Sequence, residues 1–249
     1  MDIGTLQRLS GQTWPGLEQC RLGEWELRAA EGFTSRANSA LPIGDPGVPN
    51  AEAIDRVGRW YAARGLPARF QVPATLDGSL GPADELDRWC DSNGWGAEPW
   101  TLVMARDARP LGLAAVLDVD LTEQPDEAWL NLYHHHGAEL PEAARRVITA
   151  APARYLTGRV DGEVVGIGRV AVAGSIAVLT AIEVAGDHRR KGYGLAITEA
   201  LAGAGVDLGA TLTVLQVFAH NEPAVRLYHR LGFTDHHRYR YRTPKRSPD

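Results

Sequence analysis

The alternation of apolar and polar residues is clearest in the second half of the chain, where it predicts strands. Residues 153–185 are rich in valine and isoleucine, and turn-forming pairs interrupt them at Asp161-Gly162 and Gly174-Ser175. Because tight turns of this kind join antiparallel strands, the segment predicts three strands connected as hairpins.

Helical and strand patterns then alternate toward the end of the chain. Residues 192–205 predict a helix, residues 211–219 a strand, and residues 237–242, where arginine alternates with tyrosine, a strand with one packed face. Between the last two strands, a helix is expected to begin after Asn221, which can cap it, and to end at Gly232. One face of this helix is expected to be buried, because apolar residues recur on it at helical spacing: Ala224, Leu227, Tyr228 and Leu231.

The first half of the chain repeats this order of elements. Residues 52–65 predict a helix, residues 68–72 a strand, and residues 85–105 a helix, a glycine-aromatic break and a last strand. Within that break, Gly94-Trp95 aligns with Gly232-Phe233 of the second half. The chain is therefore interpreted as a diverged tandem duplication.

Composition and charge narrow the classes of protein. The 249 residues are 44% hydrophobic and 23% charged, which is typical of a globular protein, and no apolar run approaches the roughly 20 residues of a membrane span. The formal charge of -5 at pH 7 gives no overall attraction to nucleic acid or anionic lipid. Two cysteines exclude a disulfide framework, and no basic segment precedes an apolar one at the start, so we expect a cytoplasmic protein.

Residues 187–194, DHRRKGYG, place three consecutive cations and two glycines between a predicted strand and a predicted helix. Glycine lets the backbone approach a phosphate closely, the first N–H groups of a helix point at it, and the helix dipole favours negative charge. The pattern lacks the Gly-Lys-Ser/Thr of a P-loop and the third glycine of a dinucleotide fingerprint. Taken alone, it is more typical of a solvated basic turn.

A second segment changes this interpretation. Residues 221–233, NEPAVRLYHRLGF, follow the basic stretch with one predicted strand between them, and together the two segments resemble the GNAT superfamily of acyl-CoA-dependent N-acyltransferases. The resemblance covers residues 114–242, while the first half is only loosely similar to the partner halves of tandem GNAT proteins. It implies an α+β fold in which helices flank a mixed, mostly antiparallel sheet, splayed open between the strand ending at Val184 and the strand over residues 211–219.

The resemblance also implies acetyl-CoA as the acyl donor and a site for it. Main-chain groups of Ile182 and Val184 would pair with the pantetheine arm, and an N–H near Val184 would stabilise the oxyanion. Asn221 and Tyr228 would lie near the thiol, where Tyr228 would act as the acid, although a tyrosine on the packed face of a helix is also ordinary core. The pyrophosphate would be held by the amides of Arg189, Arg190, Lys191, Gly192, Tyr193, Gly194 and Leu195.

The general base is less well determined by the sequence. Glu183 is the first candidate, although strict alternation along the strand would turn its side chain away from the face of its neighbours, and such a residue is commonly solvated. Gln216 stands where some members of the superfamily carry glutamate, but an amide cannot accept a proton at neutral pH. His220, directly after the strand, is a third candidate and equally an ordinary loop residue.

Other notable stretches are better explained without a ligand. Residues 134–136 are successive histidines, whose side chains would diverge by about 100° on a helix, so no metal site is predicted. Residues 237–246 are basic and aromatic, as a nucleic-acid surface would be, but a terminal strand with a tyrosine face explains them. Five tryptophans suit a hydrophobic core better than the wall of an acceptor pocket between the halves: Trp25, Trp60, Trp89, Trp95 and Trp100.

The two halves differ where the donor site would lie. Opposite the basic stretch the first half has residues 36–50, and opposite Tyr228 it has Cys90, so only the second half is expected to be catalytic. The join is expected near residues 115–133, where a short strand precedes a helix entered at Thr122. We therefore expect a degenerate GNAT-like domain over residues 1–113 and a catalytic domain over residues 114–249.

These patterns lead us to expect an N-acetyltransferase that moves acetyl from acetyl-CoA to a primary amine in a ternary complex. A covalent intermediate is not expected, because neither Cys20 nor Cys90 lies in the matched segment. The acceptor would be a small-molecule or protein amine, and neither a membrane nor a nucleic acid is an expected partner. Two alternatives stay open: a catalytically silent acyl-CoA-binding module, and an acetyltransferase of protein lysines or N-termini.

Overall fold

A single twelve-stranded sheet runs through the computed structural model, which describes residues 1–109, 117–133 and 140–245. The strands of the first half are β1 (Glu18–Leu22), β2 (Trp25–Ala29), β3 (Ala40–Leu41), β4 (Phe70–Ala74), β5 (Trp95–Ala97) and β6 (Thr101–Asp107). Those of the second half are β7 (Asp118–Thr122), β8 (Arg154–Val160), β9 (Glu163–Ala173), β10 (Ile176–Val184), β11 (Leu212–Phe218) and β12 (Thr234–Pro244). Their order is β1-β2-β3-β4-β12-β6-β11-β10-β9-β8-β7, and β5 pairs with β12.

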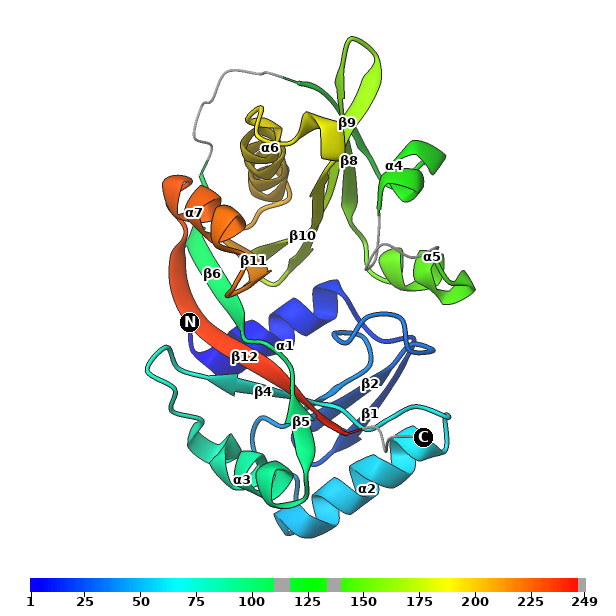
Figure 1. The fold of residues 1–249 in the computed structure, drawn as a ribbon, viewed down its shortest axis with the longest axis vertical. Coiled ribbons are helices and arrows are strands. Elements are labelled where there is room, and N and C mark those ends of the chain that lie inside the picture. Colours follow the sequence, from blue (N-terminus) through cyan, green and yellow to red (C-terminus); the bar gives the residue numbers. More distant parts are fainter. Residues whose placement is uncertain (110–116, 134–139, 246–249) are drawn as a thin grey trace.

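Helices flank this sheet (Figure 1). The first half contributes α1 (Ile3–Thr13), α2 (Asn50–Ala62) and α3 (Asp84–Ser92), and the second half α4 (Glu127–Leu132), α5 (Glu142–Ile148), α6 (Tyr193–Asp207) and α7 (Glu222–Arg230). Short 3-10 helices, η1 (Gly81–Ala83) and η2 (Gly186–His188), precede α3 and α6. In Figure 1 the second half lies above and the first half below, with α1 between them. The expected α+β fold is confirmed.

The strands and helices predicted over residues 153–242 are confirmed. The three hairpin strands are β8, β9 and β10, followed by α6, β11, α7 and β12 in the expected order. Asn221 caps α7, since its Oδ1 atom accepts a hydrogen bond from the Ala224 N–H at 3.3 Å. Helix α6 continues through Gly205, where a Cβ would come within 2.5 Å of the Ala177 Cβ, so glycine allows the helix to lie close against the sheet.

Two details of the prediction were wrong. Thr122 does not begin a helix, because it is the last residue of β7 and pairs with Tyr155; α4 begins after Asp126, whose carboxylate accepts a hydrogen bond from the Trp129 N–H at 2.6 Å. The apolar face of α7 is half-buried rather than buried, and only Leu231, just beyond the helix, is fully covered. That face borders an open cleft, described below.

The two halves of the chain repeat one order of elements. In the first half β2 and β3 are antiparallel, α2 connects β3 to the parallel strand β4, and α3 follows. In the second half β9 and β10 are antiparallel, α6 connects β10 to the parallel strand β11, and α7 follows. The hairpin of β1 and β2 and the helix α1 were not predicted. The proposed domain boundary at residue 113 lies outside the described residues.

The last strands of the two halves are exchanged. Strand β6 pairs antiparallel with β11 of the second half, from Thr101 opposite Phe218 to Asp107 opposite Leu212. Strand β12 pairs with β4 of the first half and also with β6. Both strands cross from one half to the other in Figure 1. The halves therefore share one hydrogen-bonded sheet and cannot turn relative to each other without breaking strand pairs.

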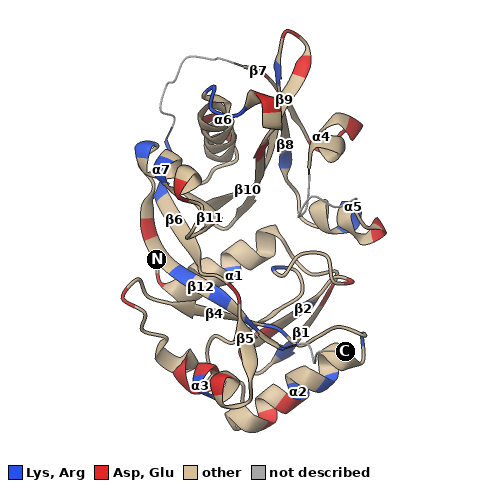
Figure 2. Ribbon diagram, in the orientation of Figure 1, with Lys and Arg blue, Asp and Glu red and all other residues tan. Residues whose placement is uncertain are grey.

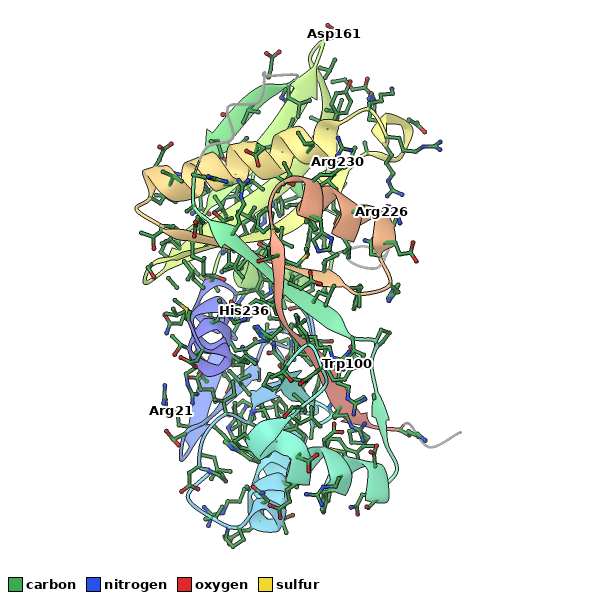
Figure 3. The ribbon with its side chains drawn as sticks, turned by 90° about the vertical axis from the view of Figure 1, so that its left-hand side faces the viewer. Arg21, Trp100, Asp161, Arg226, Arg230 and His236 are labelled. Carbon is green, nitrogen blue, oxygen red and sulfur yellow. The ribbon has the colours of Figure 1, made fainter. Side chains whose placement is uncertain are left out.

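Most first-half tryptophans belong to a hydrophobic core, as expected. Trp100, labelled in Figure 3, is not part of this core. Its ring centroid lies 4.3 Å from the guanidinium carbon of Arg238 on β12. The others are part of the core or pack against it: Trp25, Trp60, Trp89 and Trp95.

A chain of buried polar side chains joins α1, β4 and β12. The Gln71 amide donates to Gln7 Oε1 at 3.0 Å, and the Gln7 amide donates to Nε2 of His237 at 2.8 Å. Nδ1 of His237 lies 2.8 Å from Nδ1 of His236, whose Nε2 is 3.0 Å from the Met1 carbonyl. Since Nε2 of His237 must accept a hydrogen bond, this arrangement requires a neutral His237. Burial, and then the neighbouring His236, lower the pKa of His237 to about 3.

Acid should therefore destabilise the fold through His237. Its pKa is about 3 in the folded chain and about 6.5 in an unfolded one. The unfolded chain thus gains a proton first as the pH falls. The stability that the neutral ring contributes is complete above pH 6.5 and is lost between pH 6.5 and 3, at about 1.4 kcal/mol per pH unit. Denaturant unfolding should show a loss of about 2 kcal/mol between pH 6.5 and 5. His237→Gln, which does not titrate, should lose less over this range; an identical loss would contradict the assignment.

Candidate functional site

A cleft opens where β10 and β11 part. The two strands are parallel and paired from Ile176 opposite Leu212 to Leu179 opposite Leu215, and beyond this point they separate. A bulge causes the separation: the register of β10 against β9 shifts between Thr180 and Glu183, and Ala181 adopts φ 53°. The resulting cleft has a volume of about 340 Å³. The predicted opening of the sheet is confirmed.

Main-chain groups of β10 face this cleft. The Ala185 N–H donates to the Val165 carbonyl at 3.0 Å, on the side of β9. Because main-chain groups alternate in direction along a strand, those of Ile182 and Val184 point to the other side, toward the cleft. The Val184 carbonyl accordingly accepts a hydrogen bond from the side chain of Arg189 at 3.3 Å. Both residues therefore direct their main-chain groups away from β9.

The basic stretch forms the turn that enters α6. Arg190 adopts φ 63° and Gly192 φ 89°, and Gly192 is the N-cap of the helix, with no side chain capping it. The first N–H groups of a helix lack intrahelical partners, and a Cβ at Gly192 would meet no atom within 4 Å. Three cationic residues, Arg189, Arg190 and Lys191, directly precede this end of α6, where the ribbon is blue in Figure 2. The turn therefore has the open space, amides and positive charge of an anion site.

Helix α7 places two predicted residues at the cleft. Tyr228 lines it, and burial raises the pKa of this tyrosine to about 12, so the phenol stays neutral and can donate a hydrogen bond. Asn221 lines it as well, beside its capping role at α7. The structure thus brings Ile182, Asn221 and Tyr228 to one cleft, whereas Val184, the last residue of β10, is not among its lining residues.

The structure distinguishes the three candidates for the general base. Glu183 lines the cleft, and its negative charge adds to burial in raising the pKa of Tyr133 to about 12. Gln216 also lines the cleft, but its side-chain oxygen accepts a hydrogen bond from the Tyr239 hydroxyl at 2.9 Å. His220 is exposed and stacks on a neighbouring ring. Of the three, Glu183 is the one ionisable side chain that lines the cleft.

A second cavity, which we call the chamber, adjoins the cleft. Its volume is about 290 Å³. It shares with the cleft Tyr133, Leu179, Thr180, Ala181, Gln216 and Phe218, and its other lining residues are Trp14, Thr34, Ser35, Arg36, Glu98, Thr101, Tyr239 and Tyr241. The chamber therefore lies between the halves, at the open end of the sheet.

Sequence reasoning missed the chamber residues. None of the five tryptophans considered for an acceptor pocket lines it, whereas Trp14, at the end of α1, does. Arg36 and Tyr133 come from connections that carry no motif. Two signals were available: Gln216, which was considered as a base, and the tyrosine face of β12, whose Tyr239 and Tyr241 belong to a hydrophobic core, as expected, and also line the chamber.

Residues 1–109, 117–133 and 140–245 offer neither a metal-binding cluster nor a helix that could span a membrane. That part of the chain contains no group of three or more histidine, cysteine, aspartate or glutamate side chains able to hold a metal ion. The histidines 134–136 lie outside it. None of the described helices has the length and apolar character needed to cross a membrane.

The family model described as "Probable histone acetyltransferase Rv0428c C-terminal" matches residues 1–242. The chain belongs to this family. It is 31% identical over 252 residues to the "Probable histone acetyltransferase Rv0428c" of Mycobacterium tuberculosis, which covers 96% of this chain and 73% of that protein. It is 27% identical to the "Uncharacterized N-acetyltransferase YobR" of Bacillus subtilis, over 97% of this chain and 98% of that protein.

Solved structures agree on the fold of this Rv0428c C-terminal family member. A GCN5-related N-acetyltransferase from Kribbella flavida superposes with a TM-score of 0.72 at 17% identity, covering 98% of this chain and 93% of that one. A tandem GNAT protein from the clavulanic acid biosynthesis pathway gives a TM-score of 0.63 at 15% identity, covering 85% and 76%. The protein is thus a GNAT-superfamily acetyltransferase, as the two sequence segments suggested.

Proposed function

We propose that this acetyltransferase uses acetyl-CoA as donor and a primary amine as acceptor, with direct transfer between them in a ternary complex. The observation that carries the proposal is the cleft between β10 and β11, which Tyr228 lines and beside which the uncapped end of α6 lies. A thioester held in this cleft would have an anion site for its pyrophosphate and a phenol for its sulfur.

The donor would be bound mainly by the main chain. Ile182 and Val184 direct main-chain groups into the cleft, where an extended amide chain such as pantetheine can pair with them as a strand would. The pyrophosphate would lie on the amides of residues 190–194, with the Arg190 and Lys191 side chains adding countercharge. The expected amides of Arg189 and Leu195 are not available, because they donate to the carbonyls of Gly186 and Gly192 at 3.3 and 3.1 Å. The open space at Gly192 leaves room for it.

Bound acetyl-CoA supplies an activated acetyl group, to which the amine nitrogen forms a C–N bond as the C–S bond breaks. An N–H of Ile182 or Val184, facing the cleft, would stabilise the oxyanion. Glu183 would take the proton that the amine loses. Tyr228 would donate a hydrogen bond to the leaving thiolate.

The raised pKa of Tyr228 determines how this residue can assist the leaving thiolate. A phenol with a pKa of about 12 is a weaker acid than a thiol of ordinary pKa, about 8.5, by roughly 3.5 units or about 5 kcal/mol. Complete proton transfer to the thiolate would therefore be uphill. A hydrogen bond from Tyr228 stabilises the thiolate without that cost, and solvent can protonate it after release.

Neither cysteine suits a covalent intermediate. Burial raises the pKa of Cys90 to about 11, which disfavours the reactive thiolate. Cys20 is exposed on β1, and neither residue lines the cleft or the chamber. Attack by the amine on the thioester itself is the simpler route.

The acceptor would approach through the chamber. At about 290 Å³ the chamber is at the small end of ligand sites, which favours a small amine. The name of the Mycobacterium tuberculosis relative favours a second candidate, acetylation of a protein lysine. A silent acyl-CoA-binding module remains the alternative without chemistry.

Release of coenzyme A tests the proposal directly. Protein incubated with acetyl-CoA and a broad panel of primary amines and lysine peptides should release free thiol with at least one acceptor, and mass spectrometry should find that acceptor heavier by one acetyl group. Tight acetyl-CoA binding without thiol release for any amine would instead support the silent module.

Gly192→Glu should abolish binding of coenzyme A. The new carboxylate would stand beside the proposed phosphate position, where it would repel the ligand and occupy its space. Gly209→Glu is a matched control at the other end of α6, because Gly209 has the same φ of 89° and the same open surroundings. Calorimetric titration should show binding lost only in the first variant; equal binding by both would refute the proposed pyrophosphate site.

Tyr228→Phe should lower kcat by about 100-fold while changing acetyl-CoA affinity little, because the lost hydrogen bond acts mainly on the developing thiolate. Tyr155→Phe is the control, since it removes another buried hydroxyl, one that donates to the Ile148 carbonyl away from the cleft. Steady-state rates and calorimetry separate the two effects. An unchanged kcat in Tyr228→Phe would eliminate this role.

A further inference from the structure

The chamber contains an arginine whose charge the described residues do not balance. Arg36 lines it from the connection after β2, and its Nε atom is buried without a hydrogen-bond partner among the described residues. Its guanidinium carbon lies 5.9 Å from the ring centroid of Trp14, another lining residue. Within that part of the chain, Arg36 forms no ion pair with a carboxylate.

Two further arginines increase the positive potential behind the chamber wall. Arg28 is 3% exposed and donates to neutral oxygens of Ser39 and Gln71, at 3.2 and 2.7 Å. Arg169 is 0% exposed and donates to main-chain carbonyls at 3.0 to 3.3 Å. Burial is the main cause that lowers the pKa of both arginines; Tyr241 and Glu26 beside Arg28, and Tyr155 beside Arg169, act in the opposite direction, and the charge of Arg36 lowers both pKa values. These charges therefore repel one another, and a bound anion would relieve the repulsion.

The described carboxylates near the chamber either lie beside another arginine or line the cleft instead. Glu98 lines it, but its Oε1 lies 3.3 Å from Nε of Arg69. Glu183 lines the adjoining cleft and not the chamber. Arg36 is half-buried, and its buried Nε atom has no partner among the described residues. Because a cation that is partly removed from water is stabilised by an anionic partner, the chamber is suited to a ligand that brings its own negative group.

The position of Arg36 is fixed by its loop. The buried side chain of Asn38 accepts hydrogen bonds from the N–H groups of Ala30 and Gly32, at 2.7 and 3.0 Å, and donates to the carbonyls of Phe33 and Thr34, at 2.8 and 2.9 Å. A loop tied at both ends in this way can hold a binding side chain in one place.

A second polar atom without a partner lies where the chamber meets the cleft. Thr180 lines both cavities, is 8% exposed, and its Oγ1 atom is buried with no hydrogen-bond partner among the described residues. Unsatisfied buried hydroxyls are uncommon in folded proteins. An amine at this junction could donate to Oγ1 while it faces the cleft.

We propose that the acceptor is a small primary amine that carries a carboxylate, with the carboxylate on Arg36 in the chamber and the amine beside Thr180 at the mouth of the cleft. This inference rests on the proposed function and specifies its substrate class. A guanidinium binds carboxylate and phosphate alike, but among the described lining residues one arginine faces the ligand, which matches the single charge of a carboxylate.

The test compares each acid with its neutral counterpart. The probes are the standard amino acids, β-alanine and γ-aminobutyrate, each beside its carboxamide, together with phosphoethanolamine and a lysine peptide. Thiol release gives kcat/KM, and calorimetry on the protein with coenzyme A present gives binding without turnover. The variants are Arg36→Gln and Thr180→Val. Arg21→Gln is the control, since Arg21 is exposed on β1 and paired with Glu26 (Figure 3).

The accepted acids should exceed their amides in kcat/KM by about 10- to 100-fold, the range for a charge-assisted hydrogen bond. Arg36→Gln should remove this preference and Arg21→Gln should keep it, while acetyl-CoA affinity stays unchanged in both. Thr180→Val should lower kcat/KM for acids and amides equally, because both carry the amine.

The remaining outcomes distinguish a wrong assignment of the acceptor from a wrong assignment of the reaction. Equal use of acids and amides, an Arg36→Gln variant that keeps the preference, or selective use of phosphoethanolamine or the lysine peptide would refute the carboxylate acceptor and leave the acetyltransferase standing. Carboxylate-dependent binding without thiol release from any probe would refute the proposed reaction and retain the anion subsite. An absence of both binding and release would refute the inference.

Discussion

The site depends on the bulge that ends the pairing of β10 and β11. Up to Leu179 and Leu215 the two strands form an ordinary parallel pair, and without the bulge their hydrogen bonds could continue and close the space between them. The left-handed conformation of Ala181 lies in the bulge, and such a conformation costs a residue other than glycine about 1–3 kcal/mol. Because the bulge ends the strand pairing, the main-chain groups of Ile182 and Val184 are directed at a cleft instead of at a neighbouring strand.

The strand exchange supplies the second constraint. The chamber is lined by α1 and the loop after β2 from the first half, and by β10, β11 and β12 from the second. Two halves joined by a linker alone would sample many relative positions. Because β6 and β12 each complete the sheet of the other half, the walls of the chamber belong to one continuous sheet, which keeps Arg36 at a fixed distance from Thr180.

The sequence predicted those features of the fold that local residue patterns determine. Valine-rich runs, turn-forming pairs and the cap at Asn221 predicted β8 to β12, α6 and α7 correctly, whereas α5 was not predicted; two segments indicated the superfamily. The helix placed at Thr122 failed because Asp126, four residues later, offers an equally good cap and β7 needs Thr122 for pairing. The chamber could not be predicted, since it joins residues far apart in the chain, such as Arg36 and Tyr239, and the exchange of β6 and β12 leaves no local pattern.

The two halves differ in the loop that precedes the helix after their parallel-strand crossover begins, and this difference bears on where the two proposed substrates would bind. The connection from β3 to α2, residues 42–49, occupies the place of the basic turn before α6, yet it contains no lysine or arginine, and Pro49 stands at the N-cap of α2. The first half therefore lacks the charge that an anion site at this helix needs. It contributes Trp14 and Arg36 to the chamber instead. In the proposed function the halves therefore have different roles: the second would provide the donor cleft and the reacting groups, and the first would provide residues that select an acceptor.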